Sequence, residues 1–182
     1  MSLLQPPVDP ARDHVRGPRQ PAVTLMQYGD FQCPYCAEAY PEVREALART
    51  GERVAFVFRH FPLADKHPHA EAAAQAAEAA GAQGRFWAMH DRLYEAGPRE
   101  LEPAMLRDHA RAAGVEDLER FDAGLAGGAH LGRVREDLDG GLAGGVRGTP
   151  SFFLDGEPYS GFYDAETLTE VLVALLAAVD RQ

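Results

Sequence analysis

The sequence predicts an α/β fold in which a small sheet is interrupted by a block of helices. Three observations indicate this fold. Two apolar runs typical of buried strands, at 23–28 and 53–59, flank a segment with helical periodicity. Nothing strand-like follows between 62 and 145, where short amphipathic patterns succeed one another. A hairpin signal and a final helical pattern end the chain, so the predicted order is β-α-β, helical block, β-β-α.

The predicted sheet begins after an extended arm. Residues 1–20 hold four prolines and no periodic apolar pattern, so we expect them to be extended. After Cys33, apolar residues recur at three- and four-residue steps, which predicts a helix that ends at Gly51. Pro34 in its first turn costs no hydrogen bond, whereas Pro41 inside it should kink the helix.

The middle of the chain is predicted to be a mostly helical block of short amphipathic helices. Its final segment contains Gly140, Gly141, Gly144 and Gly145, and each glycine in a helix interior costs about 1 kcal/mol relative to alanine. We therefore expect that stretch to fray or to act as a hinge. The predicted helices are 70–80, 85–96, 103–113, 118–125 and 131–142.

The final segment is predicted to be a β-hairpin followed by a helix. Asp155-Gly156 is a strong signal for a two-residue hairpin turn after the strand 151–154. Asp164 is placed to cap the last helix. The residues expected on its inward face are Leu168, Leu172, Leu175 and Val179.

Composition and charge exclude several functional classes. The formal net charge is −10 at pH 7, and such a surface repels phosphate backbones and anionic lipids. We therefore expect neither nucleic-acid nor membrane partners. No segment is apolar over a length that spans a bilayer, and the first residues lack the apolar core of a secretory signal. As it stands, we expect the chain to be cytoplasmic; it would be periplasmic or otherwise extracytoplasmic if an export signal had been removed.

The only two cysteines form a Cys-x-x-Cys pair between a predicted strand and a predicted helix. Cys33 would lie where unpaired N–H groups and the helix dipole favour thiolate over thiol, so we expect it to be the nucleophile. Cys36, one turn further, would attack the resulting mixed disulfide and release the product. Pro34 and Tyr35 between them would tune how oxidising the pair is.

Two other interpretations of the pair carry less weight. Two cysteines supply only half of a tetrahedral zinc site, and no further ligands stand at suitable spacing. An inert buried pair is equally compatible with the composition, since free cysteine is common in cores. His67 and His69 are expected to cap and solvate a loop, so no metal site is predicted.

Several segments resemble the DsbA-like branch of the thioredoxin superfamily. Residues 28–36 resemble its active-site segment, and residues 148–153 resemble the segment that holds its cis-proline. Residues 59–63, and Pro41 eight positions after the first cysteine, are also similar to this branch. The resemblance extends from about residue 14 to the end of the chain.

The resemblance implies a thioredoxin-like fold with an inserted α-helical domain. Its thioredoxin-like core would comprise 21–62 and 147–182, the helical insertion 63–146, and the N-terminal arm 1–20. It also implies a cis bond between Thr149 and Pro150, which would expose the Thr149 backbone beside the first cysteine to pair with an extended substrate.

One position departs from the family pattern. Relatives carry a buried glutamate or aspartate six residues before the first cysteine, where this chain has Gln27. Such a carboxylate can take the proton of the second cysteine, and an amide cannot. We predict that the thiolate step at Cys36 relies on water or on Cys33. Asp30 is a possible substitute acid, but we expect it to be solvated and to cap the turn.

These observations predict a protein disulfide oxidoreductase without a bound cofactor. Its partners would be cysteine-containing protein substrates and an unidentified redox partner. Cys-Pro-Tyr-Cys also resembles the glutaredoxin dithiol motif, so a glutathione-linked reductase is an alternative, although glutaredoxins lack the helical insertion. A non-catalytic thioredoxin-fold binding module is a third possibility. The direction of the reaction, whether oxidation, isomerisation or reduction, stays open.

Overall fold

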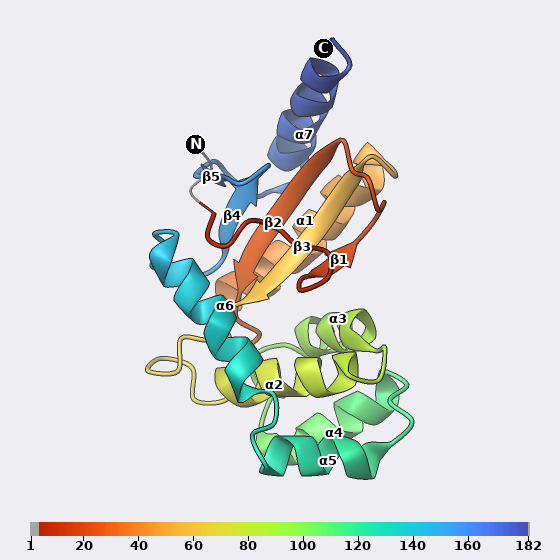
Figure 1. Ribbon diagram of the computed structural model, residues 1–182, viewed down its shortest axis with the longest axis vertical. Coiled ribbons are helices and arrows are strands. Elements are labelled where there is room, and N and C mark those ends of the chain that lie inside the picture. The colour runs from red at the N-terminus through yellow and green to blue at the C-terminus, as the bar shows by residue number, and fades with distance from the viewer. Residues whose placement is uncertain (1–3, 182) are drawn as a thin grey trace.

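In a computed structural model, which describes residues 4–181, the strands form one mixed sheet in the order β1-β3-β2-β4-β5 (Figure 1). The central strand β2 pairs parallel with β3 and antiparallel with β4, while the edge strands β1 and β5 are both antiparallel to their neighbours. The strands are β1 (His14–Arg16), β2 (Val23–Gly29), β3 (Val54–His60), β4 (Ser151–Leu154) and β5 (Glu157–Tyr159).

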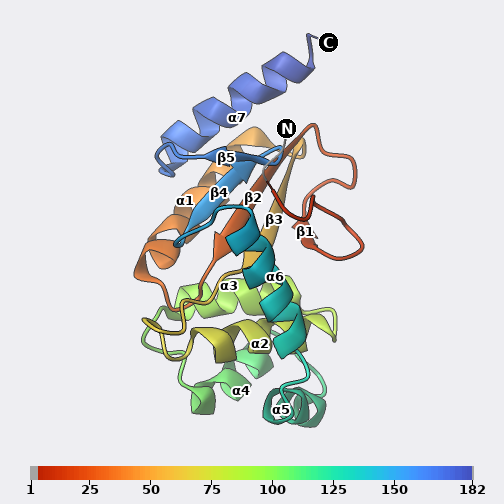
Figure 2. The ribbon, with the colours of Figure 1, turned by 60° about the vertical axis from the view of Figure 1, so that its left-hand side comes forward.

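The helices follow the predicted order, so the α/β fold is confirmed. α1 packs against α7 on one face of the sheet, and α6 crosses the other face. The remaining helices, α2 to α5, lie beyond the ends at which β2 and β3 terminate (Figures 1 and 2). The bounds are α1 (Pro34–Thr50), α2 (Ala70–Gly81), α3 (Phe86–Ala96), α4 (Pro103–Ala112), α5 (Leu118–Ala126), α6 (Leu131–Ala143) and α7 (Ala165–Val179). Within residues 4–181, no helix combines the length and the apolar character that crossing a bilayer requires.

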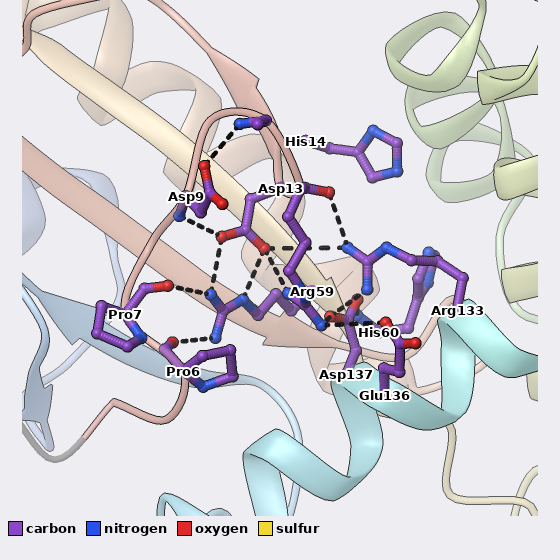
Figure 3. A network of polar contacts seen from close by, with 12 residues as sticks. Pro6, Pro7, Asp9, Asp13, His14, Arg59, His60, Arg133, Glu136 and Asp137 are labelled. Carbon is purple, nitrogen blue, oxygen red and sulfur yellow. Dashed lines mark hydrogen bonds and ion pairs between the residues drawn. The ribbon is translucent and has the colours of Figure 1, made fainter.

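The segment expected to be an extended arm contributes a strand and part of the core. β1 pairs with β3. The sequence did not predict this strand, because three residues are too few to show a periodic pattern. The segment is held by Arg59 of β3, whose side chain is fully buried. Its guanidinium donates to both carboxylate oxygens of Asp13, at 2.9 and 2.7 Å, and to the carbonyl oxygens of Pro6 and Pro7 (Figure 3). This bidentate ion pair and the two carbonyl contacts anchor residues 6–13 on the sheet, while residues 1–3 of the expected arm lie outside the described part of the chain.

Gly140 and Gly141 lie inside α6 and are required by close packing, so the expected fraying is wrong at these two positions, whereas the helix ends before Gly144 and Gly145. α6 continues through Gly140 and Gly141, and Gly141 is buried. A Cβ on Gly140 would lie 2.6 Å from the carbonyl oxygen of Gln5. A Cβ on Gly141 would lie 2.7 Å from the ring of Phe61. The missing side chains allow α6 to approach the sheet and the N-terminal segment, and this packing outweighs their low helix propensity.

The C-terminal hairpin and helix form with the predicted local signals. Asp155 and Gly156 both have positive φ, 48° and 86°, as a two-residue hairpin turn requires. The Asp164 carboxylate accepts a hydrogen bond from the N–H of Thr167 and caps α7. The predicted inward face is correct at Leu168 and Leu172, which are buried, but wrong at Val179, which is 41% exposed. The last turn of α7, to which Val179 belongs, extends past the sheet (Figure 1).

Candidate active site at the amino end of α1

The two cysteines lie where the chain passes from β2 into α1. Cys33 is the N-cap residue, and its carbonyl oxygen accepts the first helical hydrogen bond from the N–H of Ala37 at 3.1 Å. Pro34 occupies the first helical position, where it needs no N–H donor. Cys33 and Cys36 are free thiols, 2% and 0% exposed. The helix start therefore places both sulfurs in one turn, with the first closer to the surface.

The surroundings of Cys33 stabilise its thiolate. They lower its pKa from the ordinary 9.0 to about 5, chiefly through a hydrogen bond from the Cys36 thiol, although burial opposes the shift. Thr149 and the N–H groups of Cys36 and Tyr35 add further hydrogen bonds to the sulfur. Because Pro34 has no N–H, Tyr35 supplies the first free donor of the helix. Cys33 is consequently ionised at neutral pH.

The fold has the opposite effect on Cys36. Burial raises the pKa of Cys36 well above its ordinary value, and the negative charge of Cys33 raises it further. One thiol is thus prepared to attack, while the other stays protonated until the first has reacted. This asymmetry is what a nucleophilic and a resolving cysteine need.

The segment before β4 meets the cysteines across the sheet. The Thr149–Pro150 peptide bond is cis. The Cys33 thiol donates to the carbonyl oxygen of Thr149 at 3.4 Å, which joins residues 116 positions apart. The Thr149 hydroxyl is buried and, within the described part of the chain, has no hydrogen-bond partner while Cys33 is a thiol. Tyr35 lies on the outside of the turn, where 60% of its surface is exposed.

Gln27 is buried beneath α1. Only 3% of its surface is exposed, and its amide nitrogen has no hydrogen-bond partner among the described residues. The side chain borders a small cavity together with Tyr40, Val43 and His90. The position is therefore as buried as the resemblance implies for a family carboxylate, but it carries no charge.

Asp30 is the residue that sequence reasoning misjudged. We expected it to be solvated and to cap the turn. It does cap the turn, but it is 2% exposed, and its carboxylate also accepts a hydrogen bond from a second loop. Its Oδ1 accepts from the N–H groups of Gln32 and Cys33, at 2.7 and 3.2 Å. Its Oδ2 accepts from the N–H of Leu63 at 2.9 Å and contacts Nδ1 of His67 at 2.7 Å. The carboxylate holds the cysteine turn against the loop that follows β3.

A second contact joins the same two loops. The Gln32 side-chain oxygen accepts from the N–H of His69 at 2.7 Å. His67 and His69 thus belong to the support of the cysteine turn, a role that the sequence did not predict. The available signal was an aspartate directly after a buried strand, but which loop would cover it depends on the packing of α2.

Three further histidines contact acidic side chains. Nε2 of His14 and Nε2 of His60 each lie 2.8 Å from the same Oε1 of Glu78. Nδ1 of His90 contacts Asp91 at 2.9 Å. Over residues 4–181, no group of three histidine, cysteine, aspartate or glutamate side chains is arranged to hold a metal ion.

Known proteins share both the sequence and the fold. The thioredoxin family model matches residues 10–174. Among curated relatives, the Na(+)/H(+) antiporter NhaA 1 of Salinispora arenicola is 48% identical over 174 residues, and NhaA of Herminiimonas arsenicoxydans is 42% identical over 172 residues. These alignments cover 96% and 94% of this chain but 26% and 27% of the relatives. The chain therefore spans about a quarter of their length.

Three solved structures are similar over almost the entire chain. BdbD from Bacillus subtilis, in its oxidised form, has a TM-score of 0.80 at 22% identity, covering 93% of this chain and 95% of that chain. A thioredoxin-like oxidoreductase from Silicibacter pomeroyi has a TM-score of 0.76 at 25% identity, with 93% and 94% coverage. α-DsbA1 from Wolbachia pipientis has a TM-score of 0.80 at 16% identity, with 99% and 98% coverage. The sheet and its helical insertion are shared as one arrangement.

Proposed function

Because this chain belongs to the thioredoxin family and has the fold of DsbA-like oxidoreductases, we propose that it exchanges disulfides with protein substrates through Cys33 and Cys36. The observation that carries the proposal is the opposite effect of the fold on the two thiols. The pKa of Cys33 is lowered to about 5, and burial raises that of Cys36. A structural pair would need no such difference.

The reaction proceeds through a mixed disulfide. When the pair starts oxidised, a substrate thiolate attacks Cys33, forms a bond to its sulfur and displaces the Cys36 thiolate, which takes a proton. A second substrate thiolate then attacks the substrate sulfur of that bond, and Cys33 leaves as a stabilised thiolate. The substrate gains a disulfide, and its two electrons remain on the dithiol. The reverse sequence reduces a substrate.

We propose oxidation as the favoured direction. Stabilising the Cys33 thiolate favours the dithiol form, so the disulfide accepts electrons more readily. At pH 7 a thiol whose pKa is about 5 instead of 9.0 is ionised, and the two units between its pKa and the pH measure how much the dithiol form is stabilised. That difference amounts to about 2.7 kcal/mol, or about 60 mV for a two-electron couple. Disulfides made in this way persist only in an oxidising compartment, so we also propose that the chain works outside the cytosol.

The substrate is proposed to be an extended, cysteine-containing polypeptide. The Thr149 backbone beside Cys33 offers it a place to pair, with Pro150 setting the direction of the chain there. Tyr35 is 60% exposed next to the nucleophile and would contact the same substrate. An aromatic side chain at this position favours polypeptide over a small thiol, since it adds apolar area beyond the disulfide itself.

The reduction potential of the pair tests the proposal. Equilibration in glutathione buffers, followed by acid quenching and thiol labelling, should give a reduction potential of about −120 mV. A value between about −200 and −270 mV would favour a glutaredoxin- or thioredoxin-like reductase instead. Cys36→Ser should attack a disulfide-bonded model protein, release one of its sulfurs as a thiolate and stay trapped in the mixed disulfide, while Cys33→Ser should trap none. A wild-type Cys33 that resists alkylation at neutral pH would favour a non-catalytic binding module.

A further inference from the structure

A tyrosine of the helical block reaches the cysteine turn. Tyr94 lies near the end of α3 and is 5% exposed. Its ring packs on Phe31, with centroids 4.9 Å apart, and stacks on Tyr40 of α1 at 5.3 Å. Its hydroxyl points at the end of β2, because a Cβ on Gly29 would lie 2.8 Å from it. These neighbours precede and follow the cysteines in the chain, so the Tyr94 side chain lies against the segment that carries the pair.

The Tyr94 hydroxyl has no hydrogen-bond partner among the described residues, although it is buried. Buried tyrosine hydroxyls almost always find a partner, and one that does not requires an explanation. Burial raises the pKa of Tyr94 well above its ordinary value, and the charges on Cys36, Asp30 and Cys33 raise it further, in that order. The hydroxyl is therefore protonated, and after burial the charge on Cys36 acts on it most strongly, so it is available as a donor toward that sulfur.

The other groups that favour the Cys36 thiolate are the backbone of Asp30 and the side chain of Thr149, and together they do not offset the burial that raises its pKa. Cys36 must become a thiolate before it attacks, yet it is fully buried. Gln27 stands where the resemblance implies a carboxylate, and Asp30 already accepts hydrogen bonds from both neighbouring loops. A hydroxyl that donates to the new anion would stabilise the buried charge without moving any loop.

We propose that the Tyr94 hydroxyl donates a hydrogen bond to the Cys36 thiolate, so that the helical insertion assists the resolving step. This inference rests on the proposed disulfide exchange. In the step concerned, Cys36 sulfur bonds to Cys33 sulfur, the bond from Cys33 to the outgoing sulfur breaks, and the outgoing thiolate carries away the electron pair. The Cys36 proton passes to that thiolate or to buffer, and Tyr94 keeps its own proton throughout.

An aromatic disulfide with a coloured leaving thiolate separates the two steps. The reduced protein should release one equivalent when Cys33 attacks and a second when Cys36 resolves the mixed disulfide. In Tyr94→Phe we expect the first phase to keep its rate and the second to slow about tenfold, because a hydrogen bond to an anion is lost. The pH midpoint of the second phase should also rise. The other titratable groups that face the Tyr94 hydroxyl or ring are Asp30, Cys33, Tyr40 and His90, and all four are unchanged in the variant.

Tyr40→Phe is the matched control. Tyr40 stacks on Tyr94, but its hydroxyl contacts Glu95 and Arg44 at the surface, so both phases should match those of the wild type. Tyr94→Phe removes only an unpartnered hydroxyl, and its unfolding midpoint should not fall. An unchanged second phase, or an equal slowing of both phases, would overturn the role of Tyr94. A wild-type protein that releases no coloured thiolate would instead overturn the proposed function, and this inference with it.

Discussion

Replacing Cys36 by alanine should raise the pKa of Cys33, because the hydrogen bond from the Cys36 thiol is the largest contribution that lowers it to about 5. A hydrogen bond to a charged group contributes about 1.5–3 kcal/mol, which corresponds to about one to two pKa units. The rate of iodoacetamide alkylation against pH, together with the ultraviolet absorbance of the thiolate, would measure the midpoint. Cys36→Ser is the matched control, since its hydroxyl can still donate and should preserve most of the shift.

The same pKa sets the pH dependence of stability. Folding lowers the pKa of Cys33 from 9.0 to about 5, so it stabilises the ionised form. The contribution to the reduced protein is complete above the unfolded value and is lost as the pH falls through the folded value. It amounts to about 2.7 kcal/mol at neutral pH. The oxidised protein has no thiol to titrate, so acidification should lower the unfolding free energy of the reduced form relative to that of the oxidised form. If Cys33 had the same pKa in Cys36→Ala as in the wild type, or a wild-type pKa near 9.0, the reasoning about its thiolate would be refuted.

Four further substitutions test other parts of the site. Thr149→Val removes a buried hydroxyl and should raise the pKa of Cys33 by about one unit, measured by the same alkylation profile. Asp30→Ala leaves buried N–H groups unpaired and should lower the unfolding free energy by about 2–4 kcal/mol in urea titrations. Gly141→Ala should destabilise by about 1–3 kcal/mol despite its higher helix propensity, since its Cβ meets a buried ring at 2.7 Å; a more stable variant would contradict the packing. Gln27→Glu introduces a buried acid and should shift the pH–rate profile of the resolving step, whereas an identical profile would exclude any influence of this position.

Features that depend on neighbours in the chain were predictable from the sequence. The hairpin turn at Asp155-Gly156 needs two residues that tolerate positive φ, and the cap at Asp164 needs one oxygen near the N–H groups that follow. The order of strands and helices follows from apolar periodicity. The placement of Cys33 and Cys36 at a helix start belongs to the same class, because only a strand, a turn and a helical pattern are involved.

Features that depend on which distant segments meet were decided by the tertiary structure. The sequence allowed Asp30 to be solvated, and the loop after β3 buried it. The sequence predicted a weak helix around Gly140 and Gly141, and contacts with Phe61 and the N-terminal segment leave no room for a Cβ at these two positions. In the sequence Tyr94 is one of several apolar positions on a predicted helix, and only the packing of α3 against Phe31 brings it to the cysteine turn. Local hydrogen bonds and steric limits act within a few residues, so the chain encodes them position by position. Burial and long-range contacts arise only when all elements share one core, and no single segment specifies them.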